Sequence, residues 1–299
     1  MKTVISIVGA TSTGKTDLAI KLAQYLATEI ISCDSRQFFQ EMPIGTSAPT
    51  RSELLVVPHH FIGNLTVADR YSIGQYETDA MKKTEKLFQK HEVLILVGGS
   101  MMYEKALITG LNDLPEAMAE NQETLHKIWR KEGIIGLQKL LQKLDPEYAQ
   151  VVDLNNPRRL LRAIDVIWQT NQKYSVLISK LQKPRNFRTI RIGIEAPREI
   201  IYSRIDKRVN KMLEMGLVEE VKNLKHYENE VPLKTVGYSE IFGYFNGRYS
   251  LDFAISEIKK NTRRFAKRQL TWYRKETDIH WVSYDEAFGE SLFLLHSLL

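Results

Sequence analysis

The sequence of 299 residues has a single cysteine and no apolar run long enough to cross a bilayer. Cys33 alone cannot form a disulfide within the chain, and one cysteine excludes any zinc finger that is built from cysteines. The apolar run nearest to spanning length is interrupted by charges, so we expect no contact with a membrane. We expect the first strand to begin within three residues of the N-terminus, which leaves no room for a signal peptide. These features predict a soluble protein of a reducing compartment, the cytoplasm.

Acidic residues are absent from one segment near the C-terminus, residues 259–275, which contains eight Lys or Arg. Its spacing predicts a helix with an apolar side and a cationic side. The apolar side consists of Ile255, Ile258, Phe265, Gln269 and Trp272. The cationic side consists of Lys260, Arg263, Arg264, Lys267, Arg268, Arg274 and Lys275. A solvated face generally mixes both signs of charge, so this acid-free segment favours binding to nucleic acid over a merely solvated face.

The segment GATSTGKT, residues 9–16, matches the phosphate-binding pattern G-x-x-x-x-G-K-[ST]. An apolar stretch of strand length precedes it, and leucines at helical spacing follow it. The predicted loop consists of Gly9, Ala10, Thr11, Ser12, Thr13, Gly14, Lys15 and Thr16. Its backbone N–H groups would face an anion at the positive end of a helix, Lys15 would add a cation, and the Thr16 hydroxyl suits Mg²⁺. The alternative is a glycine turn that matches by chance.

Polar residues follow two further predicted strands. Residues 29–33 form an apolar run that ends at Asp34 and Ser35, and residues 93–97 form another that ends in two glycines and Ser100. Ligands collect at the carboxyl ends of parallel strands, so Asp34 could accept a proton or bind magnesium. Its alternative role is to cap a turn. ATP-hydrolysing proteins with this loop usually have an acid after such a strand, and its absence before Ser100 weakens that interpretation.

The middle of the chain changes from short apolar strands to helical periodicity. We predict an α/β core formed by residues 1–110 and 187–299, with a helical insertion at residues 111–186. One predicted helix of the insertion starts at Asn156 and Pro157 and carries three arginines. These are Arg158, Arg159 and Arg162. They could contact an RNA backbone, and a structural role for at least one of them is an equal alternative.

Two arginines one turn apart, Arg204 and Arg208, lie on a long amphipathic helix predicted at residues 198–221. They could cover a phosphate site, as the lid arginines of small kinases do. Alternatively they are surface charges that pair with Asp206 or Glu199. Spacing alone does not favour either interpretation.

Together these segments resemble the bacterial tRNA dimethylallyltransferases, also called tRNA isopentenyltransferases, over nearly the whole chain. The resemblance rests on GATSTGKT, SCDSRQFF, MPIGT, VPHHFIG, YSIGQYETDA, VGGSMMYEKAL, VGYSEI and AKRQLTWYR. It implies a P-loop kinase-like parallel sheet with an inserted all-helical domain that contacts tRNA. It also implies transfer of a dimethylallyl group from dimethylallyl diphosphate to the exocyclic amine of adenosine 37, beside the anticodon, with release of diphosphate. A monomer that uses Mg²⁺ is implied as well.

The resemblance also implies roles for individual residues. Asp34 would be the general base, and Ser100, where the family usually has threonine, would form a hydrogen bond near the reacting centre or to the diphosphate. Lys15, Arg208 and Thr16 with Mg²⁺ would stabilise the departing diphosphate. Contacts with tRNA are implied for Asp34, Ser35, Arg36, Gln37, Ser100, Gln122, Arg158, Arg159, Arg162, Gly237, Tyr238, Lys267, Arg268, Gln269, Trp272 and Arg274.

Two alternatives to this function come from other classes of protein. One is a P-loop kinase of a nucleoside or small metabolite, which would consume ATP without RNA. The other is a non-catalytic RNA-binding protein that has lost its reaction. The acid-free segment argues against the first alternative, and the combination of Lys15, Thr16 and Asp34 argues against the second.

Overall fold

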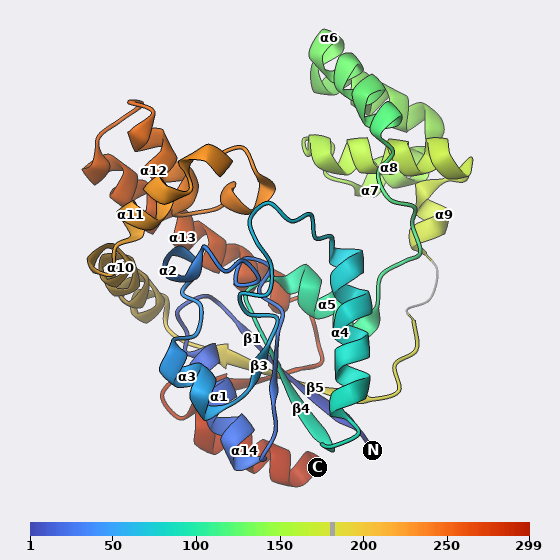
Figure 1. The fold of residues 1–299 in the computed structure, drawn as a ribbon. Helices are drawn as coiled ribbons and strands as arrows, with labels where there is room; N and C mark the ends of the chain where they lie inside the picture. The colour runs from blue at the N-terminus through green and yellow to red at the C-terminus, as the bar shows by residue number, and fades with distance from the viewer. Residues whose placement is uncertain (180–182) are drawn as a thin grey trace. The chain divides into compact units, whose positions relative to one another are not determined.

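The computed structural model describes residues 1–179 and 183–299. It contains two compact units, drawn in Figure 1. One is formed by Met1–Ile108 with Arg185–Leu299, and the other by Thr109–Pro184. Among the described residues, no helix combines the length and the apolar character that crossing a membrane requires.

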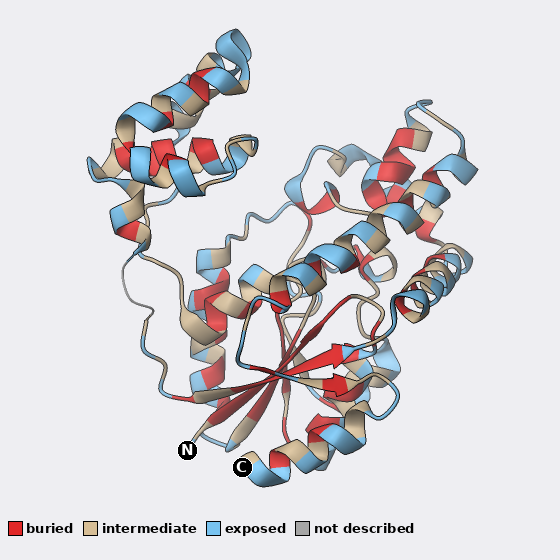
Figure 2. Ribbon diagram, turned by 180° about the vertical axis from the view of Figure 1, so that it is seen from behind, coloured by how far each residue is buried: buried red, intermediate tan, exposed pale blue. Residues whose placement is uncertain are grey.

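The first unit is built on a six-stranded sheet with the order β3-β2-β4-β1-β5-β6, in which every strand pairing is parallel. The strands are β1 Thr3–Gly9, β2 Ile30–Ser32, β3 His59–His60, β4 Val93–Val97, β5 Arg188–Glu195 and β6 Ile279–Ser283. Helices cover both faces, so the central strands are buried on both sides and read as continuous apolar runs. Figure 2 shows the buried residues concentrated in these strands. The predicted α/β class with a parallel sheet is confirmed.

The described residues of the first unit also contain ten α-helices. They are α1 Lys15–Tyr25, α2 Pro43–Thr46, α3 Arg51–Val56, α4 Ile73–Leu87, α5 Met101–Thr109, α10 Arg198–Glu214, α11 Leu217–Asn223, α12 Tyr238–Phe245, α13 Leu251–Tyr273 and α14 Ala287–Leu298. On one face, α1 and α14 pack against the inward side chains of β1 through Leu22 and Leu295. On the other face, α4, α10 and α13 contribute Tyr76, Ile205 and Ile258 to the larger core.

Two helix predictions need correction. The single helix expected at residues 198–221 is wrong, because Gly216 has φ +98°, in the left-handed region, and separates α10 from α11. The basic segment at 259–275 belongs to α13, which ends at Tyr273. Arg274 and Lys275 therefore lie just beyond the last residue of the helix.

The second unit consists of α6 Ala119–Leu144, α7 Pro146–Val151, α8 Pro157–Thr170 and α9 Tyr174–Ile178 in its described part. Leu137 and Leu141 of α6 pack against Leu160 and Ile164 of α8. The expected start of α8 is confirmed: the Asn156 side chain accepts from the Arg159 N–H and Pro157 occupies the first turn.

Candidate active site

Three strand ends meet at one edge of the sheet. Because β1, β4 and β2 are neighbours and run parallel, the segments that follow them lie side by side. The phosphate loop follows β1, the Gly98–Ser100 segment follows β4, and Asp34 lies just beyond β2. The Cys33 N–H donates to the Val97 carbonyl at 2.8 Å, which holds the last two segments together.

The phosphate loop closes around its own lysine. Gly14 has φ +101° and begins α1 at Lys15, so the loop turns sharply into the helix N-terminus. The Lys15 ammonium donates to the Ala10 carbonyl at 2.6 Å, and the Thr13 hydroxyl donates to the same oxygen at 2.9 Å. Burial, and secondarily the nearby Arg208 cation, lower the pKa of Lys15 from 10.5 to about 8. A buried lysine with such a shifted pKa marks a candidate functional site, and an anion bound beside it would favour its charged form.

Two hydroxyls of the loop lack partners among the described residues. Ser12 Oγ is buried without a hydrogen bond, which is costly unless a ligand completes the site. The Thr16 side chain is partly exposed and its hydroxyl has no bond within the part of the chain that the structure describes. Both hydroxyls are therefore available to an anion or to a cation bound with it.

Arg208 extends from α10 to the phosphate loop. Its Nη1 donates to the Thr11 hydroxyl at 3.1 Å and its Nε donates to Ser47 Oγ at 2.8 Å. Burial lowers the pKa of the Arg208 guanidinium, and the Asp34 carboxylate partly opposes this. Arg204, one turn earlier, donates to the Thr13 carbonyl at 3.3 Å. Both arginines therefore contact the phosphate loop, and among the described residues neither forms an ion pair with Asp206 or Glu199.

Asp34 combines a turn-forming oxygen with an available one. Its Oδ1 accepts from the Arg36 N–H at 3.0 Å, which is the capping interaction considered as its alternative role. Its Oδ2 has no hydrogen bond among residues 1–179 and 183–299, and it lies beside Gly99. A Cβ added at Gly99 would be 2.7 Å from Asp34 Oδ2, so only glycine permits this approach. One carboxylate oxygen thus holds the loop while the other remains free for a substrate.

Ser35 and Ser100 join the two segments on the Asp34 side of the site. The Ser35 N–H donates to Ser100 Oγ at 3.0 Å, and the two hydroxyls are 2.8 Å apart. Nearby, Gln37 Nε2 donates to the Ser47 carbonyl at 3.1 Å, and Arg36 Nη1 donates to the Val231 carbonyl at 3.2 Å. The structure therefore brings four consecutive residues predicted for substrate binding to one rim, with Ser100 beside them.

Tyr238 supports the α2 turn from inside the core, through Glu220. Its ring is fully buried, and its hydroxyl donates to Glu220 Oε1 at 2.6 Å. Glu220 also accepts from the N–H groups of Ile44 and Gly45 at 2.8 and 2.9 Å. The predicted RNA contact of Tyr238 needs correction, because the side chain is inside the core. Gly237 precedes it with φ +97°, a conformation that lets α12 begin there.

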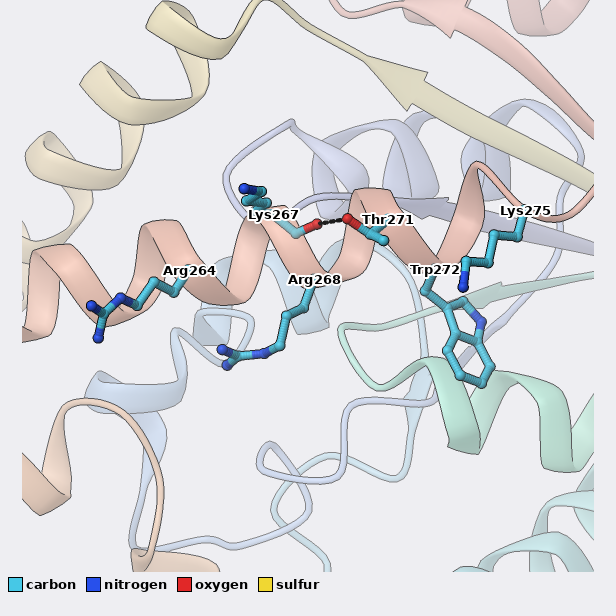
Figure 3. Close-up of a pocket in the computed structure, with 6 residues that line it drawn as sticks. All are labelled: Arg264, Lys267, Arg268, Thr271, Trp272 and Lys275. Carbon is cyan, nitrogen blue, oxygen red and sulfur yellow. Dashed lines mark hydrogen bonds between the residues drawn. The ribbon is translucent and has the colours of Figure 1, made fainter. Parts of the chain in front are cut away.

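The exposed side of α13 forms a groove of about 390 Å³, shown in Figure 3. The groove is lined by Arg264, Lys267, Arg268, Thr271, Trp272 and Lys275. Among the described residues, none of its four cations forms an ion pair. In Figure 3 Arg264 and Arg268 extend from the same side of the helix, and the Trp272 ring lies farther along that side. A row of cations with an aromatic ring suits phosphates together with an unstacked base.

Three cations of the predicted cationic side instead have acidic partners: Lys260 pairs with Glu257, Arg263 with Asp206 and Arg274 with Glu195. Arg263 contacts both oxygens of Asp206, at 2.6 and 2.7 Å, and so ties α13 to α10. Its placement on the open cationic side is wrong, because the partner acid comes from another helix. Trp272, expected on the apolar side, packs against the cluster of Val8, Tyr273 and Ile279 and also lines the groove.

In the helical unit, Arg158 and Arg159 are exposed, whereas Arg162 is half-buried. Arg162 Nη2 donates to the Pro115 carbonyl at 2.6 Å, and Nη1 lies 3.6 Å from the buried carboxylate of Asp165. Arg162 therefore has the structural role that the sequence left open for one of the three arginines. Gln122 on α6 is partly exposed.

Sequence reasoning did not identify Glu220, Thr46 or Ser47 as part of this site. Arg208 Nη2 and Gln37 Nε2 both donate to the Thr46 carbonyl, at 3.3 Å in each case. These contacts use a backbone oxygen and a short hydroxyl, so the residue types carry no signal of them. The motif MPIGT indicates the family without indicating these bonds.

Comparison with known proteins agrees with this arrangement. The family model described as IPP transferase matches residues 37–276. The chain is 49% identical over 282 residues to the tRNA dimethylallyltransferase of Christiangramia forsetii, covering 94% of this chain and 93% of that protein. It is 43% identical to tRNA dimethylallyltransferase 1 of Bacteroides fragilis, with coverage of 94% and 93%. Neither of these relatives is a kinase of a nucleoside or metabolite.

Solved structures show similarity to the same group of enzymes. The full-length tRNA isopentenylpyrophosphate transferase of Bacillus halodurans has a TM-score of 0.72 and 31% identity, covering all of this chain and 95% of that one. A eukaryotic dimethylallyltransferase acting on tRNA has a TM-score of 0.83 and 26% identity, covering 95% of this chain and 74% of that one. With its phosphate loop, its carboxylate at the neighbouring strand end and these relatives, the chain belongs to the IPP transferase family.

Proposed function

We infer that the protein transfers the dimethylallyl group of dimethylallyl diphosphate to the exocyclic amine of adenosine 37 in a tRNA and releases diphosphate. The observation that carries this function is the placing of two cations, the buried Lys15 and the partly buried Arg208, beside one available carboxylate oxygen of Asp34. The cations suit a leaving diphosphate, and the carboxylate suits an amine that must lose a proton.

On the donor side, the phosphate loop holds the diphosphate. The developing negative charge lies on the oxygen that leaves the allylic carbon, and preorganised donors stabilise it most. Lys15, Arg208 and the buried Ser12 hydroxyl are such donors. Arg208 is oriented by its bonds to Thr11 and Ser47, whereas Lys15 exchanges its bond to the Ala10 carbonyl for one to the diphosphate.

Mg²⁺ fits the Thr16 hydroxyl at the start of α1. No group of three or more His, Cys, Asp or Glu side chains in the described residues could hold a metal ion. Mg²⁺ does not require such a group, because it prefers one or two protein oxygens together with substrate phosphates and water. When bound, the ion would neutralise part of the diphosphate charge. Thr16 is the residue of this chain that would hold it.

On the acceptor side, Asp34 Oδ2 takes the proton. The amine nitrogen attacks the allylic carbon, the carbon–oxygen bond breaks, and its electron pair leaves with the diphosphate. The adenine amine is a weak nucleophile because its lone pair is delocalised into the ring, so a carboxylate that accepts its hydrogen helps as attack develops. Ser35 and Ser100 fix the segment next to Asp34 through their mutual bond.

The RNA binds to the groove on α13, and the exposed Arg158 and Arg159 of the helical unit add cations for its backbone. The target base leaves its stack, at a cost of a few kcal/mol, to reach Asp34. Because the donor and acceptor groups come from a single chain, we expect a monomer to suffice. A tRNA substrate is consistent with activity in the cytoplasm.

The test is an incorporation assay. Labelled dimethylallyl diphosphate, Mg²⁺ and unmodified tRNA are incubated with the protein, and label bound to RNA is measured. The matched control is the same tRNA with guanosine at position 37. We expect label only with adenosine. Transfer of phosphate from ATP to a small molecule, without labelling of RNA, would instead identify the kinase alternative.

A further inference from the structure

Gln269 lies on the inner side of α13, opposite the cationic groove. Its side chain is fully buried. Its Oε1 accepts from the Thr11 N–H at 2.7 Å, and its Nε2 donates to the Gly99 carbonyl at 2.8 Å. One amide therefore joins the phosphate loop after β1 to the segment after β4. This is a different environment from the RNA contact that the sequence predicted for Gln269.

The bond to Thr11 acts on the peptide group that anchors the catalytic lysine. The carbonyl of that same peptide group belongs to Ala10 and accepts from Lys15 Nζ at 2.6 Å and from Thr13 Oγ1 at 2.9 Å. A bond to the N–H end fixes the plane of the group and strengthens the acceptor at its other end. Gln269 thus fixes the peptide group from which Lys15 moves to the diphosphate, and with it the phosphate loop around that lysine.

The bond to Gly99 acts on the acceptor side. A Cβ added at Gly99 would lie 2.7 Å from Asp34 Oδ2 and 3.5 Å from Gln269 Nε2, so the amide and the carboxylate flank the same α-carbon. Gly99 is followed by Ser100, which bonds to Ser35. The position of the Gly99 carbonyl therefore influences the distance between Asp34 and the phosphate loop.

Burial energy alone does not account for an amide at this position. An apolar side chain of similar length would fill the same space without the desolvation that an amide requires. Both ends of the Gln269 amide are used, each by a backbone group from a different strand end. A glutamine can therefore orient these two segments, whereas an apolar residue cannot.

We propose that Gln269 is a positioning residue that holds the diphosphate-binding Lys15 and the proton-accepting Asp34 at their working separation. The proposal rests on the reaction inferred above. It assigns Gln269 to the chemical step, acting through the Ala10–Thr11 peptide and Gly99, and not to binding of RNA.

The main variant is Gln269→Met, which keeps the length of the side chain and removes both bonds. Gln269→Asn is the second variant, because its amide is one methylene shorter and cannot reach both partners. Arg268→Ala is the matched control on the neighbouring, exposed residue of α13. For each protein we would measure kcat and KM for dimethylallyl diphosphate, the Kd for tRNA, the Kd for inorganic diphosphate and the melting temperature.

We expect Gln269→Met to lower kcat/KM for the donor by about 10²-fold, the scale at which small misplacements act, with an unchanged Kd for tRNA. The kcat/KM of the Gln269→Asn variant for the donor should lie between the values of Gln269→Met and the native protein. Arg268→Ala should weaken tRNA binding and leave the diphosphate Kd unchanged. In a Lys15→Ala background, Gln269→Met should have little further effect on diphosphate binding, because residues that act through one another are not additive.

Two results would overturn the proposal. If Gln269→Met weakened tRNA binding as Arg268→Ala does and spared the diphosphate Kd, Gln269 would be an RNA contact. If Gln269→Met lowered the melting temperature, lowered kcat and weakened the binding of both substrates alike, and if the effects of the Gln269 and Lys15 variants were additive, the role of Gln269 would be purely structural. Native protein that fails to label RNA would refute the reaction itself, independently of the variants.

Discussion

The Lys15 ammonium lies 2.6 Å from the Ala10 carbonyl of its own loop, so the lysine is folded back on the backbone. Its pKa is lowered to about 8, first by burial and then by Arg208. A diphosphate group has to attract the charged form of Lys15 away from this carbonyl. Proton uptake and donor binding are therefore linked at this residue.

This linkage predicts a pH dependence of donor binding. Below about pH 8 Lys15 is charged before the donor binds, so binding needs no proton. Above it the lysine is largely neutral, so binding requires proton uptake and the KM for dimethylallyl diphosphate should rise up to tenfold per pH unit. Steady-state kinetics from pH 7 to pH 9.5 would measure this rise. A KM that stays level across that range would contradict the assignment of Lys15.

Replacement of Asp34 tests the proton acceptor. We expect Asp34→Ala to lower the chemical step by roughly 10²-fold or more, the usual scale of acid–base assistance, with tRNA affinity near normal. Asp34→Asn is the matched variant, because an amide oxygen can still accept from the Arg36 N–H and keep the turn. Single-turnover rates with saturating tRNA would separate an effect on the chemical step from an effect on tRNA affinity. Full activity of the asparagine variant would exclude Asp34 as the base.

Charge reversal in the α13 groove tests the RNA surface. Arg264→Glu combined with Arg268→Glu should weaken tRNA binding and reduce the slope of log Kd against log salt by about one for each phosphate that the variant no longer neutralises. The control is Lys222→Glu combined with Arg248→Glu, since both of these cations already pair with acids, Glu219 and Glu228. Filter binding between low and moderate salt would give the slopes. Equal slopes in the two double variants would remove α13 from the interface.

Tyr238→Phe tests the support of Arg208. The variant removes the bond to Glu220 and should destabilise the fold by about 0.5–1.5 kcal/mol, the usual contribution of one hydrogen bond. Because Glu220 holds the α2 turn whose Thr46 and Ser47 orient Arg208, the KM for the donor should also rise. Chemical denaturation and donor kinetics would measure both. A loss of tRNA affinity without any change in stability would show instead that the Tyr238 hydroxyl contacts RNA.

The features that sequence predicted well are local ones. The phosphate loop needs only a strand, two glycines and a lysine within one short segment, and the position of Asp34 follows from where an apolar run stops. The residues that identify a P-loop therefore lie within about ten residues of one another in the sequence.

The features that sequence missed or misassigned depend on distant partners. Helical periodicity placed Arg263 with the other cations, but the acid that draws it inward is Asp206, on a helix far away along the chain. Gln269 and Tyr238 lie in motifs associated with RNA, yet each is buried by groups from other strands and helices. Periodicity assigns a side of a helix, and only the tertiary fold decides what meets that side.

Cys33 is 2% exposed, directly after β2, and burial raises the pKa of its thiol well above the usual value. A protonated, enclosed thiol reacts poorly with alkylating reagents, so the native protein should resist maleimide labelling. Any cysteine introduced on the surface would then be the only reactive one. One such label on each unit would report, by energy transfer, the range of distances between the sheet-based unit and the helical unit during the catalytic cycle.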